Sequence, residues 1–128
     1  MTLEAGLVTR LSPLVSGRIA PAIAQRDMGY PMVTYQRIDT EVFGDVMDLA
    51  VPGHERIPMQ IDCWSDASYN EAVTLAEDVR TALFSATGAY DGDDVIIVRF
   101  AGMADLPELA SGEPLWRRSL TFNFVVRR

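Results

Sequence analysis

The sequence of 128 residues contains no lysine, one cysteine and one histidine. Because Cys63 is alone, an intrachain disulfide is excluded, and so is a metal site built from several cysteines. No apolar run approaches the ~20 residues that a membrane helix needs, so we expect no membrane partner. The N-terminus has no basic region followed by an apolar core, and we therefore expect no secretory signal and a cytoplasmic protein.

The charges are strongly unequal. There are 18 acidic side chains against 11 basic ones, all of them arginine, and the net charge is −7. A protein that binds nucleic acid in a sequence-specific way carries a basic surface, which this composition argues against.

The clearest local pattern lies between residues 56 and 86. Residues 56–64 alternate as a strand, with Met59, Ile61 and Cys63 on one face. Residues 68–86 follow as a helix, because apolar residues recur in it at three- and four-residue spacing. Ser68 and Glu71 have the spacing of a capping box at its start. The apolar faces of this strand and helix are expected to pack together.

The rest of the chain predicts a single domain over residues 1–128. A helix is expected at 3–10 and a second short turn at Ser12-Pro13. Extended segments are expected at 18–21, 32–39, 95–100 and 115–128, with loops at 40–55 and 102–114; a hairpin extension is the alternative for 40–55. The predicted fold class is α+β, with a mostly antiparallel sheet of about four strands and helices packed on one face.

Residues that could carry chemistry are few. His54 lies in a loop rich in proline and glycine, and Cys63 alternates with core residues. Asp62 and Asp66 do not have metal-ligand spacing, and we expect them to meet arginines or to mark the helix start. Residues 91–94 (Asp-Gly-Asp-Asp) resemble half of a calcium loop but lack its later glutamate, so a polar turn is favoured. We expect no catalytic residue, metal or cofactor.

Several phrases, in this order, resemble the bacteriophage tail-completion family, also called tail terminator or head–tail joining proteins. They are Leu14-Val-Ser-Gly-Arg-Ile19, Tyr30-Pro-Met-Val-Thr-Tyr-Gln-Arg-Ile38, Met59-Gln-Ile-Asp-Cys-Trp64, Tyr69-Asn-Glu-Ala-Val-Thr-Leu-Ala-Glu-Asp-Val-Arg80 and Leu115-Trp-Arg-Arg-Ser-Leu-Thr-Phe-Asn-Phe124. The resemblance implies a virion component of the tail or neck, made in the host cytoplasm. It implies a ring, usually a hexamer, that caps the head-proximal end of the tail tube, ends tube polymerisation and joins the tail to the head connector. The implied partners are further copies, the tail tube protein and a connector or stopper protein, with DNA only as passing cargo.

Two sets of residues follow as hypotheses. Apolar residues of the 40–55 segment and one arginine are expected at a contact with another subunit or the tube: Val42, Phe43, Val46, Met47, Leu49 and Arg117. The alternative for the apolar residues is that they fold back on their own sheet. Acids are expected to line the channel and repel DNA phosphates: Glu41, Asp45, Asp48, Asp91, Asp93 and Asp94. Arg117, Arg127 and Arg128 have an alternative role, as bridges to acidic neighbours.

Two other classes of function stay open. An acidic mimic of DNA, or another protein-binding module, would use the same −7 charge and gather its acids on one face. A small α+β enzyme would use Asp62, His54 or Cys63, and it requires a pocket that encloses at least two of them.

Overall fold

A computed structural model of the protein describes residues 3–21, 29–38, 54–84, 86–90, 92–106, 108–110 and 113–127, without the side chains of 54, 93, 108–110 and 113. The helices are α1 (Leu3–Leu11), the 3₁₀ turn η1 (Ser12–Leu14) and α3 (Tyr69–Leu83). The strands are β1 (Ile19–Pro21), β2 (Met32–Arg37), β3 (His54–Ser65), β4 (Gly88–Tyr90), β5 (Asp93–Asp105), β6 (Glu108–Ala110) and β7 (Glu113–Arg127).

Six of these strands form one sheet in the order β1-β2-β3-β7-β5-β4. β1 runs parallel to β2, while the other neighbouring pairs are antiparallel. β6 pairs with the first residues of β7 and so extends the long β5–β7 hairpin. The register places Thr34, Asp62 and Ser119 side by side across β2, β3 and β7.

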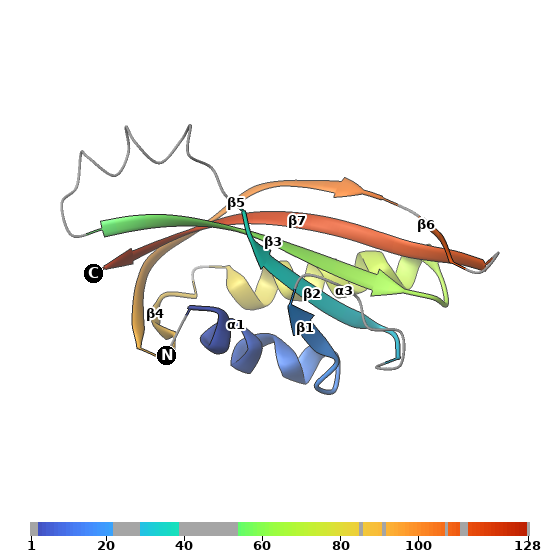
Figure 1. The fold of residues 1–128 in the computed structure, drawn as a ribbon, viewed down its shortest axis with the longest axis horizontal. Coiled ribbons are helices and arrows are strands. Elements are labelled where there is room, and N and C mark those ends of the chain that lie inside the picture. The colour runs from blue at the N-terminus through green and yellow to red at the C-terminus, as the bar shows by residue number, and fades with distance from the viewer. Residues whose placement is uncertain are drawn as a thin grey trace.

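The predicted fold class is wrong. The protein is mostly β, with a mixed sheet of six strands and two short helices, rather than four antiparallel strands with helices packed on one face. The sheet curls, so that β4 at one end comes round to α1 (Figure 1). Two irregularities in the β5–β7 pairing, at Val95/Ile97 and Phe100/Gly102, add to this curvature because a bulge bends its strand. Strands β1 and β4 have three residues each, which is too short to show an alternation of apolar and polar residues.

The main core lies between the sheet and the two helices (Figure 1). α3 contributes the stripe that its sequence predicts: Ala72, Leu75, Ala76, Val79 and Leu83. The sheet contributes the inward side chains of β3 and β7: Ile57, Met59, Ile61, Cys63, Leu120, Phe122, Phe124 and Val126. Burying each large apolar side chain is worth about 1.5–3 kcal/mol, so this cluster is the main source of stability.

The predicted capping box at the start of α3 is present only in part. Ser68 is the N-cap and its Oγ accepts a hydrogen bond from the Glu71 backbone N–H at 3.1 Å. The Glu71 carboxylate does not complete a capping box in the usual way, because it accepts a hydrogen bond from Ser65 Oγ at 2.6 Å. The same Ser65 Oγ accepts hydrogen bonds from the backbone N–H groups of Ala67 and Ser68. The turn between β3 and α3 is therefore held by two serines and one glutamate.

Most predicted elements are present, and one loop is wrong. The structure confirms the helix at 3–10, the turn at Ser12-Pro13, and the strands within 18–21, 32–39, 56–64 and 115–128. The predicted loop at 102–114 is instead the end of β5, the short β6 and the start of β7. Pro107 and Gly112 suggest a break in the chain, but the ladder continues on both sides of them because β7 supplies the partner.

Candidate interaction surface

Most of the residues predicted for an interface or a channel lie outside the described part of the chain. These are Val42, Phe43, Val46, Met47, Leu49, Glu41, Asp45, Asp48 and Asp91, together with the side chain of Asp93. Asp94 is described: it is exposed at the start of β5, and its Oδ2 lies 3.8 Å from Nη1 of Arg127. Arg127 therefore bridges to an acid of its own chain, and an exposed pair of this kind contributes about 1 kcal/mol or less.

Arg117 lies on the outer face of the sheet, away from the helices. Its guanidinium carbon is 4.8 Å from the centre of the Trp64 ring, and its Nη1 is 3.7 Å from Asp62 Oδ2. The prediction that Asp62 meets an arginine is confirmed. Arg117 is thus held within its own subunit, and its contact with another subunit stays a prediction.

A buried polar network surrounds Asp62, whose exposed fraction is 6%. Gln60 Nε2 donates to both carboxylate oxygens, at 3.1 and 3.2 Å. Nearby, Trp64 Nε1 donates to Thr34 Oγ1 at 2.9 Å. The alternation of β3 places Gln60, Asp62 and Trp64 on one face, but only the pairing with β2 brings in Thr34. These contacts satisfy the polar groups structurally, as buried polar groups require.

The residues of the enzyme hypothesis do not come together. Cys63 is fully buried on the core face of β3, and burial raises the pKa of its thiol far above the ordinary value. Asp62 points to the opposite face of the same strand. The backbone of His54 lies nine residues along β3 from Cys63, about 30 Å at the rise of a strand. The hypothesis of a pocket enclosing two of these residues is therefore wrong.

Among the described residues, no group of three or more histidine, cysteine, aspartate or glutamate side chains could hold a metal ion. Within the same residues, no helix is long and apolar enough to cross a bilayer.

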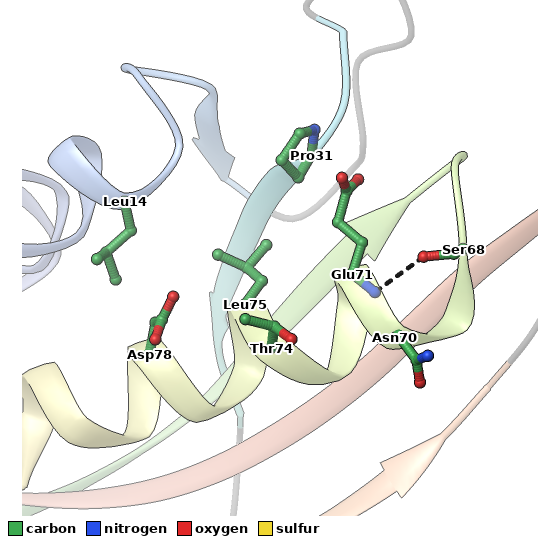
Figure 2. A pocket seen from close by; sticks show the side chains of 8 residues that line it. All are labelled: Leu14, Pro31, Ser68, Asn70, Glu71, Thr74, Leu75 and Asp78. Atoms are coloured by element: carbon green, nitrogen blue, oxygen red, sulfur yellow. Dashed lines mark hydrogen bonds between the residues drawn. The ribbon is translucent and has the colours of Figure 1, made fainter.

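An open groove of about 420 Å³ lies between α3, η1 and the residue before β2 (Figure 2). Its apolar side is formed by Leu14, Pro31 and Leu75, and its polar side by Ser68, Asn70, Glu71, Thr74 and Asp78. The dashed line in Figure 2 is the capping bond from Glu71 to Ser68, so part of the polar side serves the helix start. The lining includes neither a basic side chain nor a nucleophile with an adjacent histidine, so it favours no acyl or phosphoryl transfer.

The exposed large apolar side chains lie along other elements. Every large apolar side chain that is exposed in the described residues lies on β5, directly after it, or at one end of α3: Tyr69 (42%), Phe84 (80%), Ile97 (39%), Met103 (51%) and Leu106 (39%). We call this set the β5–α3 surface. Sequence reasoning missed it, since β5 was expected to end at residue 100. The register pairs Ile97 with Val125 on the outer face and Met103 with Leu120 on the helix face, so these exposed side chains flank β5 on both faces. Exposed apolar area of this kind is typical of surfaces that bind another macromolecule.

Comparison with known proteins identifies a similar fold and a family. No curated protein sequence matches the chain. A solved structure described as "Virion of native gene transfer agent (GTA) particle" contains a chain with a similar fold: the TM-score is 0.66 and the identity 15%, over 98% of this chain and 94% of that one. The family described as "Tail completion protein gp17" matches residues 7–127. The chain therefore belongs to the tail completion protein gp17 family, and it is a structural tail protein.

Proposed function

We propose that the protein assembles as a ring, a hexamer, on the head-proximal end of the tail tube. There it ends polymerisation of the tube and joins the tail to the head connector or stopper protein. The observation that carries this proposal is the family match over residues 7–127. The β5–α3 surface supports it, because a protein that acts by assembly needs exposed apolar area for its partners.

A ring requires two different patches on each subunit, one for each neighbour. Under this proposal the apolar residues of the 40–55 segment form part of a contact with another subunit or with the tube: Val42, Phe43, Val46, Met47 and Leu49. Arg117 contributes the exposed part of its side chain to the same contact. The polar network around Asp62 holds Arg117 in one orientation, which lowers the entropy cost of binding there.

Charge gives the ring a second property. Six copies carry −42, six times the −7 of one chain. Acids that face the channel would repel DNA phosphates within a Debye length of about 8 Å, so DNA would pass without binding. We propose Glu41, Asp45, Asp48, Asp91, Asp93 and Asp94 for this lining.

The DNA-mimic alternative has less support. A mimic presents unpaired carboxylates in place of phosphates. Here Arg37, Arg117, Arg127 and Arg118 lie within 4.0 Å of Glu4, Asp62, Asp94 and Asp105, respectively. Each of these acids is at least partly neutralised by its own chain.

Electron microscopy of particles assembled with and without the protein tests the proposal. We expect tails of uniform length joined to heads in its presence, and overlong or headless tails in its absence. Uniform, head-joined tails without the protein would contradict it.

A further inference from the structure

The long strand β5 is paired on one side only for most of its length. β4 pairs with residues 93–95, whereas β7 pairs with residues 94–105 on the other side. From Ile96 to Asp105, no strand among the described residues covers the outer edge of β5. Such an edge presents a row of backbone N–H and C=O groups that can accept a further strand.

The outer edge of β5 has only part of the usual protection of an edge strand. Natural edge strands carry lysine, proline, inward-pointing charges or β-bulges that discourage pairing, and of these β5 has two bulges, at Val95/Ile97 and Phe100/Gly102. Between Ile96 and Asp105 there is no proline, and the charged residues are Arg99 and Asp105. Asp105 is already engaged by Arg118, which donates to it at 2.7 Å. The edge is instead flanked by the exposed side chains of Ile97 and Met103.

Helix α3 packs beneath β3 and β7, and two of its side chains reach β5. Tyr69 Oη, at the start of α3, donates to Asp105 Oδ2 at 2.7 Å. Eleven residues later, the Arg80 guanidinium lies 4.2 Å from the centre of the Phe100 ring. Those residues span about 16 Å of helix, and the segment 100–105 spans about 16 Å of strand, so α3 and β5 run in opposite directions and are joined by side chains at two points. Phe84 then follows at the end of α3, highly exposed.

From this arrangement we infer that the outer edge of β5 accepts a strand from a second copy of this chain, with the β5–α3 surface as the apolar part of that contact. The opposite edge of the sheet is β1, whose outer side also has no partner strand among the described residues. Contact between two different edges is head-to-tail, and it repeats from copy to copy until a ring closes.

The occupant that we infer is a copy of this chain because the described sheet offers two different uncovered edges, one at β5 and one at β1. Two copies carry −7 each and therefore repel one another overall. Arg80 and Arg99 flank the β5 edge and supply local positive charge, which acidic side chains of the incoming copy can meet and which fixes its orientation. This inference rests on the proposed function, since it supplies the subunit contact of the proposed ring.

The test compares the wild-type chain with the double variant Ile97→Asp/Met103→Asp. Both side chains are exposed, so the fold tolerates the change, which circular dichroism checks. The control is Thr9→Asp/Thr74→Asp, which adds the same two charges at exposed helical positions outside the β5–α3 surface. Sedimentation and native mass spectrometry measure assembly in solution and on uncapped tail tubes, and hydrogen exchange follows the amides of residues 96–105.

We expect the wild type and the control to form the same ring, with amides 96–105 protected on assembly. The double variant should need a roughly tenfold or higher concentration for half-assembly, which corresponds to about 1.4 kcal/mol or more per contact. Assembly of the double variant at the wild-type concentration would overturn the inference and leave the ring proposal standing. Protection of these amides by tube protein bound to a single copy would also overturn it. A wild-type chain that forms no ring, free or on tubes, would instead defeat the proposed function itself.

Discussion

Arg118 on β7 donates two hydrogen bonds to Asp105 on β5, from Nε to Oδ1 at 2.7 Å and from Nη2 to Oδ2 at 3.1 Å. Arg118 Nη2 also donates to Tyr69 Oη at 2.9 Å, and that hydroxyl donates to Asp105 Oδ2. The Tyr69 ring meets the edge of the Trp116 ring, with centroids 5.9 Å apart. One arginine at the end of the core face thus ties the start of α3 to both long strands.

The Arg118–Asp105 contact predicts a dependence of stability on pH. Hydrogen bonds from Arg118, and then from Tyr69, hold the pKa of Asp105 below its ordinary value. A carboxyl with a lower pKa in the folded state stabilises the protein above its unfolded pKa of about 3.9, and this contribution is lost as the pH falls through the folded value.

Asp105→Asn should therefore lower the free energy of unfolding at neutral pH by about 1 kcal/mol, since the pair is partly exposed. The difference from wild type should shrink as the pH falls below about 4. Urea unfolding at a series of pH values measures both effects. Asp78→Asn, on the exposed face of α3, controls for the loss of one acidic charge. A difference that stays constant down to pH ~2 would contradict the assignment.

Gly6 predicts a steric effect between α1 and β4. A Cβ at this position would lie 2.5 Å from Tyr90 Cα, and backbone cannot move aside as a flexible side chain can. Gly6→Ala should destabilise the protein by about 1–3 kcal/mol, although alanine is the better helix former. Thermal unfolding measures the change. Gly102→Ala is the matched control, because no atom lies within 4 Å of its added Cβ, and it should be close to neutral.

Cys63 should be unreactive while the chain is folded. Its side chain is fully buried, and burial raises the pKa of the thiol, so very little thiolate reaches the solvent at neutral pH. A thiol reagent should label the native protein at least about 100-fold more slowly than the protein in denaturant. Ala104→Cys provides an exposed thiol on β5 for comparison. Fast labelling of native wild type would show that this part of β3 opens readily.

Leu75 tests the packing of α3 against the sheet. Leu75→Asp would place an unpaired charge in the core, at a cost of several kcal/mol, which exceeds what a domain of this size can lose. We expect loss of the folded state by circular dichroism. Thr74→Asp, one position away and exposed, should remain folded. A stable, native-like Leu75→Asp protein would contradict this packing.

The sequence predicts the elements whose patterns are local. The apolar residues of helix α3 recur every three or four residues, so its buried face can be predicted from neighbouring turns. Its N-terminus is marked by Ser68 and Glu71. β3 and β7 alternate over many residues, so their core faces are readable, including the position of Arg118 among apolar neighbours. The family resemblance also rests on these elements, and the match over residues 7–127 confirms it.

Sequence reasoning could not find the features that depend on which strands are neighbours. It ended this strand at residue 100, because Pro107, Gly112 and Pro114 suggest a loop and the sequence does not show the pairing with β7. For the same reason it missed the short strands β4 and β6, the contact of Gly6 with Tyr90, and the β5–α3 surface.

By itself the amino-acid sequence determined the family, the main helix and the inward faces of two long strands, because apolar periodicity and capping act within a few residues. Only the tertiary structure decided the mixed, curled sheet, the partners of Arg117 and Arg118, and the edge of β5 that lacks a partner strand among the described residues. These depend on strand order and register, which are set by burial and hydrogen bonding between segments far apart in the chain.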